Sequence, residues 1–73
     1  MSDTVWIVVN PEGRVIGSGV KFATALDEAF ASGDIATSDV DRLRFGAYGW
    51  ADKTVSPRGF TLMRVPAQRG SDE

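Results

Sequence analysis

The first strongly patterned segment of the chain, residues 4–10, opens with the β-branched and aromatic run Thr-Val-Trp-Ile-Val-Val. Such a run predicts a strand, and its lack of polar alternation predicts that both faces of the strand are buried. The next segment, Asn10–Gly13, reads Asn-Pro-Glu-Gly, which suits a type I turn. Residues 14–20 are therefore predicted to return as the second strand of a hairpin. Gly17 and Gly19 in this strand indicate a bulge or a close approach by a helix.

One amphipathic helix is predicted over residues 21–32. Its apolar side chains recur at i, i+4, i+7 and i+8 and form a stripe that consists of Phe22, Leu26, Ala29 and Phe30. Gly33 directly afterwards is a natural residue to end the helix. An alternative places a capping pair at Thr24 and Asp27, which would begin the helix later. We prefer the longer helix because it keeps Phe22 on the stripe, and we expect the whole stripe to pack in the core.

The stretch after the helix changes from polar to alternating. Residues 34–41 are mostly polar, and Ser38 is able to cap one short helical turn. Residues 42–50 alternate in polarity, which predicts a strand. The face of this strand that is expected to pack in the core consists of Leu43, Phe45 and Ala47. The opposite, exposed face is expected to carry Arg42, Arg44, Tyr48 and Trp50.

The predicted fold class is α+β. Residues 49–59 are interpreted as a loop and residues 60–65 as the last strand, closed by Pro66. The elements then follow the order β-β-α-β-β, and the simplest arrangement is an antiparallel sheet with the one helix packed on one face. We expect a single globular domain with a small core over residues 1–66 and a flexible C-terminal tail over residues 67–73.

Charge is distributed unevenly along the chain. Residues 1–41 hold two basic and seven acidic side chains, whereas residues 42–69 hold six basic side chains and one acidic side chain. The two segments cancel, and Asp72 and Glu73 supply the net charge of −2, which therefore conceals two oppositely charged parts of the chain. Such asymmetry is an argument about partners and association rather than about the fold.

The chain contains neither cysteine nor histidine. It therefore lacks thiolate metal ligands and the commonest general base, and we expect no enzyme activity, no cofactor and no metal site. The serine–lysine pattern at Ser18–Lys21 is explained better by chance and turn chemistry, because so small a chain has no room for the other loops of such a site. The first residues show no signal-peptide pattern, and no apolar run is long enough to span a membrane.

A partner-binding surface is predicted from the basic and aromatic residues of the second half. Arginine, tyrosine and tryptophan are enriched at interface hot spots, which favours a protein partner over nucleic acid. The predicted binding residues are Arg42, Arg44, Tyr48, Trp50, Lys53 and Arg58. The competing interpretations are a solvated face without a partner and a surface that stacks bases and contacts phosphates. A rival docking site is the acidic edge around Glu12, Asp39 and Asp41.

Two segments and the length of the chain carry a resemblance. Val5–Gly13 and the run Phe45–Trp50 resemble the small phage-encoded regulators of bacterial RNA polymerase, as found in a Xanthomonas phage. The resemblance implies a non-enzymatic host-takeover protein that binds the polymerase near the β′ N-terminus and the β flap. It further implies inhibition of σ70-dependent initiation, through destabilisation of the sigma factor, and antitermination during elongation.

On this resemblance we expect a monomer in the cytoplasm of the host bacterium, without membrane association. Nascent RNA is expected as a further contact at the polymerase. Two alternatives stay open at this point. One is another phage inhibitor of a host complex, such as a blocker of CRISPR defence, and the other is a small RNA-binding module.

Overall fold

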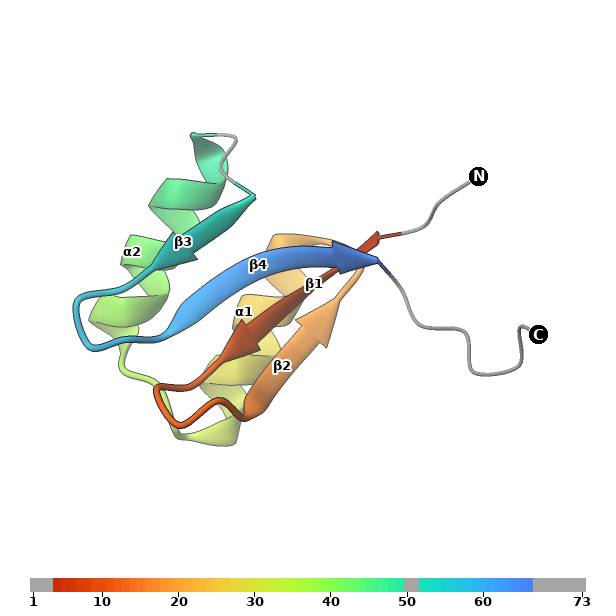
Figure 1. Cartoon of the computed structure of the whole chain (residues 1–73). Coiled ribbons are helices and arrows are strands. Elements are labelled where there is room, and N and C mark those ends of the chain that lie inside the picture. The colour runs from red at the N-terminus through yellow and green to blue at the C-terminus, as the bar shows by residue number, and fades with distance from the viewer. Residues whose placement is uncertain (1–3, 50–51, 67–73) are drawn as a thin grey trace.

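The computed structural model describes residues 4–49 and 52–66 of the chain. In chain order these residues form β1 (Thr4–Val9), β2 (Val15–Gly19), α1 (Phe22–Ser32), α2 (Thr37–Tyr48), β3 (Lys53–Val55) and β4 (Thr61–Pro66) (Figure 1). The strands pair antiparallel in the order β2-β1-β4-β3. The predicted α+β class with an antiparallel sheet is therefore confirmed, although the sheet carries two helices rather than one. The tail predicted over residues 67–73 lies outside the described residues.

The predicted hairpin is present as β1 and β2. The side chain of Asn10 closes the turn, because its Oδ1 accepts hydrogen bonds from the backbone N–H groups of Glu12 (3.0 Å) and Arg14 (2.8 Å). The register between the two strands then shifts by one position and leaves Ile16 without a partner on β1. The irregularity predicted for the second strand is thus confirmed as a β-bulge.

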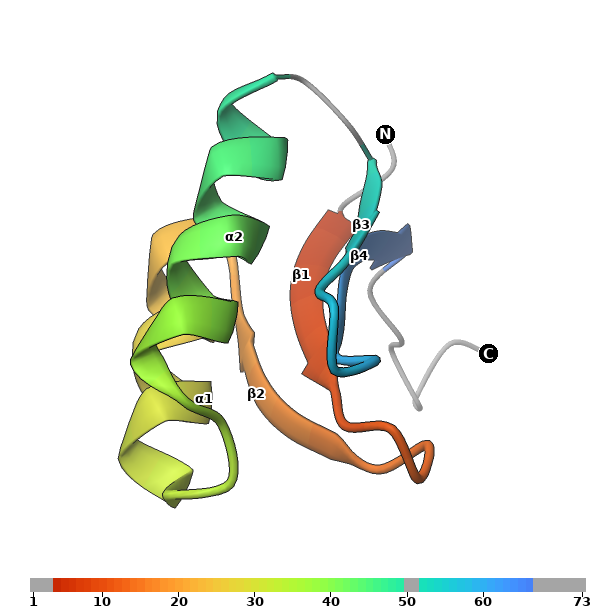
Figure 2. The same cartoon turned by 90° about the vertical axis from the view of Figure 1, so that its left-hand side faces the viewer.

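Both helices lie on the same face of the sheet, so the domain has two layers (Figure 2). α1 lies against β1 and β2, and α2 lies against β3 and β4. The approach of α1 to β2 is close, since a Cβ atom added at Gly17 would stand only 2.6 Å from the backbone nitrogen of Ala29. The sequence therefore indicated correctly that the glycines of β2 admit a neighbouring helix.

The core lies between the helices and the sheet. Val8 of β1 and Leu62 of β4 stand opposite each other on the helix-facing side, and both are fully buried. The buried cluster consists of Val8, Ala25, Leu26, Ala29, Ile35, Val40, Leu43, Ala47, Phe60 and Leu62. The helices cover only one face of β1, so the burial predicted for both of its faces is wrong among the described residues. Val5, Ile7 and Val9 on the other face are half-buried.

α1 matches the predicted helix closely. It begins at Phe22, so the later start at Thr24 is wrong. It ends at Ser32, and Gly33 caps it in the left-handed conformation (φ 83°), with its N–H group donating to the Phe30 carbonyl. Phe30 itself is 53% exposed, so its predicted packing in the core is wrong. Phe30 lies eight residues after Phe22. At about 100° of rotation for each residue, its side chain points about 80° away from that of Phe22, which turns Phe30 off the buried stripe.

The strand predicted over residues 42–50 is wrong, because residues 37–48 form α2. The buried apolar side chains of α2 recur at i, i+3 and i+7, the spacing of one helix face, and are Val40, Leu43 and Ala47. Leu43 and Ala47 also fit a two-residue alternation, but Phe45 between them is 78% exposed. Leu43 and Ala47 therefore fit both a helix and a strand, and only the exposure of Phe45 distinguishes the two.

The loop predicted over residues 49–59 contains the short strand β3, which pairs with β4. α2 approaches β3 closely at Gly46, where an added Cβ atom would stand 2.9 Å from Cβ of Thr54. The last strand predicted over residues 60–65 is confirmed as β4. β4 occupies the middle of the sheet, between β1 and β3.

Candidate functional site

The residues predicted to bind a partner come from a helix, a strand and a turn, rather than from one strand face and the loop after it. Those that the structure describes are Arg42, Arg44 and Tyr48 on α2, Lys53 on β3, and Arg58 in the turn between β3 and β4. Trp50 lies outside the described residues. Because the strand that was to align these side chains is a helix, the common face predicted for them is not present. Only the residues of α2 share one element.

Ion pairs neutralise part of the positive charge of the second half. Nη1 of Arg44 lies 3.7 Å from Oδ1 of Asp41, one turn earlier on α2. Nη2 of Arg64 lies 2.6 Å from Oδ1 of Asp52. Exposed pairs of this kind contribute little to stability. They do lower the positive charge that is available to a nucleic-acid backbone, so the charge separation seen along the sequence is weaker in the fold.

Asp39 is a buried charge in the first turn of α2, with only 2% of its surface exposed. Its Oδ2 lies 3.9 Å from Nε of Arg58 and has no hydrogen-bond donor among the described residues. The partial positive charge at the N-terminal end of a helix favours a carboxylate at this position. Arg58 is therefore the nearest cation to a buried acid, a role that the sequence did not indicate for this predicted binding residue.

Replacing Arg58 by alanine is expected to destabilise the domain by about 1 kcal/mol, because a buried carboxylate then loses its nearby cation. The effect stays modest because Arg58 is itself 71% exposed. Arg42→Ala is the matched control, since Arg42 is exposed and forms no ion pair among the described residues. Urea unfolding of the two variants measures the difference. Equal midpoints would show that Arg58 does not support Asp39.

The exposed side of α2 carries two large aromatic rings beside two arginines. We call this surface the α2 face, which consists of Arg42, Arg44, Phe45 and Tyr48. Phe45 is 78% exposed and Tyr48 is 67% exposed. Single exposed apolar residues are common on proteins, but neighbouring ones with arginines at their side have the composition of an interface hot spot. Sequence reasoning missed Phe45, because the assumed strand placed it in the core.

A row of aromatic rings connects the α2 face to the sheet. The ring of Phe22 meets that of Tyr48 edge-to-face at 5.3 Å between centroids, and it meets that of Trp6 in the same way at 5.9 Å. The guanidinium group of Arg64 lies 5.7 Å from the centre of the Trp6 ring. Such aromatic and cation–π contacts hold Tyr48 in a defined position. The exposed ring of Tyr48 is therefore presented by a rigid support.

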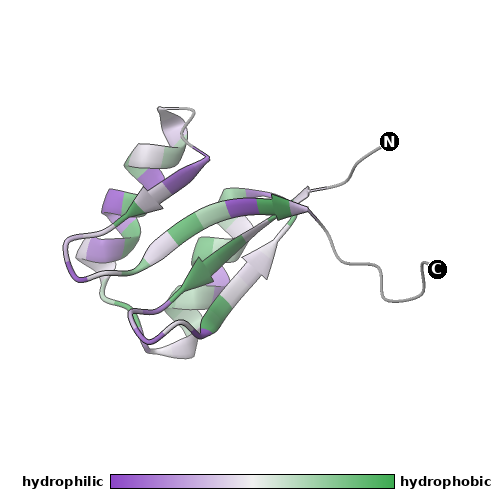
Figure 3. Ribbon diagram, viewed as in Figure 1, coloured by the Kyte–Doolittle hydropathy of each residue, from purple (hydrophilic) through white to green (hydrophobic). Residues whose placement is uncertain are grey.

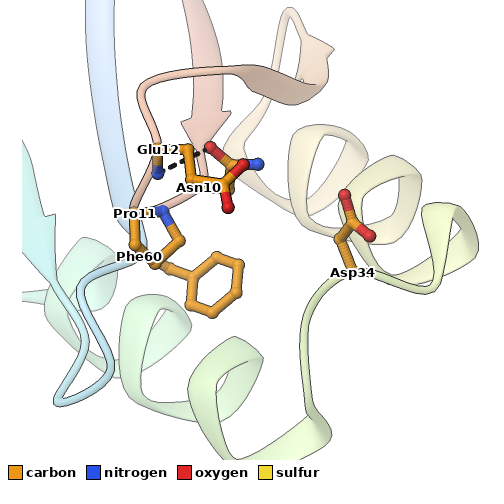
Figure 4. A pocket seen from close by; sticks show the side chains of 5 residues that line it. All are labelled: Asn10, Pro11, Glu12, Asp34 and Phe60. Carbon is orange, nitrogen blue, oxygen red and sulfur yellow. Dashed lines mark hydrogen bonds between the residues drawn. The ribbon is translucent and has the colours of Figure 1, made fainter.

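The acidic edge predicted as a rival site is arranged differently. A hollow of about 270 Å³ is lined by Asn10, Pro11, Glu12, Asp34 and Phe60 (Figure 4). Of the three acidic residues predicted for this edge, only Glu12 lines the hollow. Asp39 is buried beside Arg58, and Asp41 lies on α2 in its pair with Arg44. The acidic site therefore loses two of its three predicted members.

Metal ligands, membrane-spanning helices and similarity to known proteins add no chemistry to these surfaces. Among residues 4–49 and 52–66, no group of three or more histidine, cysteine, aspartate or glutamate side chains is arranged to hold a metal ion. In the same part of the chain, no helix has the length and apolar character needed to cross a membrane. No protein-family model, curated protein or solved structure matches the chain.

Proposed function

We propose that the protein is a non-enzymatic binding module that docks on bacterial RNA polymerase through the α2 face. The observation that carries this proposal is the exposure of Phe45 and Tyr48 on one helix, beside Arg42 and Arg44. A partner that covers both rings would remove a large apolar area from water. The favourable term is about 25 cal/mol for each Å² of apolar surface removed.

The α2 face is suited to binding because a regular helix presents its two rings and one of them is held in place by a neighbouring ring. Phe45 projects from a regular helix, and the ring of Tyr48 rests on that of Phe22. Binding therefore costs little conformational entropy at Tyr48. Arg42 supplies directional donors for carboxylates or carbonyl groups at the rim of the contact, and Arg44 adds donors beyond those that its pair with Asp41 occupies. This combination favours a protein surface with an apolar pocket and acidic surroundings.

The choice of partner rests on the resemblance to phage regulators of the polymerase. Phe45 and Tyr48 both lie within the run Phe45–Trp50 that carries part of this resemblance. The contact would lie at the N-terminal part of β′ and at the β flap, in the cytoplasm of the host. Binding there would destabilise sigma, inhibit σ70-dependent initiation and promote antitermination.

Nucleic acid is the weaker candidate for the main partner. Arg44 and Arg58 are each paired with an acidic side chain, which leaves Arg42 and Lys53 as the unpaired members of the predicted set among the described residues. Affinity for nucleic acid comes largely from neutralised phosphates, and few are neutralised by two separated cations. Nascent RNA is therefore proposed only as a secondary contact at the polymerase surface.

Affinity purification of the tagged chain from a bacterial lysate tests the proposal. The β and β′ subunits are expected to be recovered with the wild-type protein. Phe45→Ala and Tyr48→Ala are each expected to weaken recovery of purified polymerase at least tenfold, as truncation of a hot-spot residue does. Recovery of a CRISPR surveillance complex, or of RNA without polymerase subunits, would instead identify one of the alternative functions.

Phe30→Ala provides the matched control for Phe45→Ala. Both residues are exposed phenylalanines on helices, but Phe30 lies on α1 and outside the α2 face. Polymerase binding is expected to be unchanged in Phe30→Ala. Wild-type protein that recovers neither β nor β′ would overturn the polymerase assignment, and equal losses in all three variants would overturn the role of the α2 face.

A further inference from the structure

The sheet has a second surface, opposite the helices, that no described element covers (Figures 1 and 2). Side chains alternate along a strand, so the neighbours of the buried Val8 point to this other side. The pairing between strands places the residues on this side of neighbouring strands next to one another across the sheet. We call this surface the open face, which consists of Val5, Ile7, Val9, Val15, Ser18, Lys53, Val55, Thr61, Met63 and Val65.

The open face is apolar and almost without charge. Seven of its side chains are aliphatic, and Lys53 on the short strand β3 is its one charged member. Val15 is 53% exposed and Val55 is 54% exposed, at opposite edges of the sheet. Hydrophobic residues follow one another along β1 and much of β4 in the middle of the sheet (Figure 3). A continuous apolar surface of this kind marks an interaction site.

The segments outside the described residues are poorly suited to cover this face. Residues 67–73 read Ala-Gln-Arg-Gly-Ser-Asp-Glu, and residues 1–3 read Met-Ser-Asp. Residues 50–51 are Trp-Ala. These segments together bring two large apolar side chains, against seven aliphatic side chains on the open face. Another molecule is therefore the better occupant.

We propose that the open face is the interface of a homodimer, in which two copies pack sheet against sheet. Two sheets pack well when β-branched side chains interdigitate between them, and valine and isoleucine dominate this face. A twofold interface joins the same patch on both copies, so it requires a surface that is complementary to itself. A nearly uncharged apolar face meets this requirement, and a net charge of −2 opposes the association of two copies only weakly.

The size of the face predicts a weak dimer. Four strands spaced about 4.8 Å apart and about 20 Å long give a projected area of roughly 300 Å² for each copy. The relief of the side chains raises the total buried surface towards the roughly 1,000–1,200 Å² at the lower limit of specific interfaces. Dissociation is therefore expected in the micromolar range or above. The sequence led us to expect a monomer whose uncovered sheet face is basic and aromatic, whereas the open face is mainly apolar.

The dimer and the docking on polymerase use different sides of the domain. The helices lie on one side of the sheet and the open face is the other side (Figure 2). Both copies of the α2 face would therefore stay accessible in the dimer. Self-association can therefore be tested on the purified chain alone. Failure of either proposal leaves the other unaffected.

Sedimentation equilibrium of the purified protein, from about 10 μM to about 1 mM, tests the dimer. The wild-type protein is expected to approach twice the monomer mass as its concentration rises. Ile7→Lys places a charge in the middle of both faces and is expected to raise the dissociation constant at least tenfold. Val55→Lys is expected to act in the same direction, and because Val55 is exposed at a sheet edge it leaves the core untouched.

Phe45→Lys is the matched control, because it adds the same charge on the opposite side of the domain and is expected to dimerise like the wild type. Circular dichroism establishes that each variant is folded, and Val55→Lys decides the outcome if Ile7→Lys does not fold. A wild-type protein that stays monomeric over the whole range would overturn the proposal. A folded Val55→Lys protein with unchanged dimerisation would also overturn it, and would favour association through the free edge of β2 instead.

Discussion

Replacing Gly17 by alanine is expected to destabilise this domain strongly. Gly17 lies on β2 where α1 crosses, and a Cβ atom there would stand 2.6 Å from the backbone nitrogen of Ala29 and would overlap the carbonyl oxygen of Ala25. Both neighbours are backbone atoms of one helix, so a change of rotamer cannot relieve the clash. The helix would have to move away from the sheet as a whole.

The expected loss for Gly17→Ala is about 3 kcal/mol, at the upper end of what overpacking causes. A domain of this size has roughly 3–10 kcal/mol of stability in total, so the melting temperature should fall by more than about 10 °C. Ser18→Ala is the control on the same strand, because Ser18 is exposed on the open face. Thermal unfolding followed by circular dichroism compares the two. A Gly17→Ala protein that melts within a few degrees of Ser18→Ala would contradict the close approach of α1.

The second large effect is expected from Leu43→Ala, and it separates a helix from a strand over residues 42–48. Leu43 is fully buried on α2, so its truncation should cost about 2–5 kcal/mol through lost contacts and a cavity. Phe45 is 78% exposed, so Phe45→Ala should change stability by no more than about 0.5 kcal/mol. If residues 42–48 formed a strand, Leu43 and Phe45 would lie on the same face, and their replacement by alanine would cost similar amounts of stability.

Urea unfolding of Leu43→Ala and Phe45→Ala measures this difference directly. Comparable destabilisation by the two substitutions would support the strand predicted from the sequence and would contradict the α2 face. The expected result has a second use, because a Phe45→Ala protein of normal stability is required for the binding experiment. Any loss of polymerase binding in that variant then reflects the contact rather than the fold.

The parts of the fold that could be predicted from sequence are those fixed by local chemistry. The β-branched run of residues 4–9, the side chain of Asn10 in the turn and Gly33 at the end of α1 each act over a few residues, and each had the predicted effect. The segment after Gly33 was misread because its apolar residues are few. Leu43 and Ala47 fit a period of two as well as a helix, and the glycines Gly46 and Gly49 weaken any helix prediction.

The candidate site could be predicted less well, since its features depend on contacts between distant positions. Arg58 reaches Asp39 only because the turn after β3 lies beside the start of α2. Tyr48 meets Phe22 only because the end of α2 lies beside the start of α1. The linear separation of charge gave no indication of these contacts. It remains useful as an argument about association, but the fold decides which charges a partner meets.

The sheet order has a consequence for the synthesis of the chain. β1 and β4 are its central pair, and they pair along their whole length, from Thr4 opposite Pro66 to Val9 opposite Thr61. β1 is synthesised before both helices, so it has to wait for β4 to complete this pair. Until residue 66 has emerged, the hairpin and both helices have no completed sheet on which to close. Folding should be slow for so short a chain, and loss of β4 by early termination should leave no native domain.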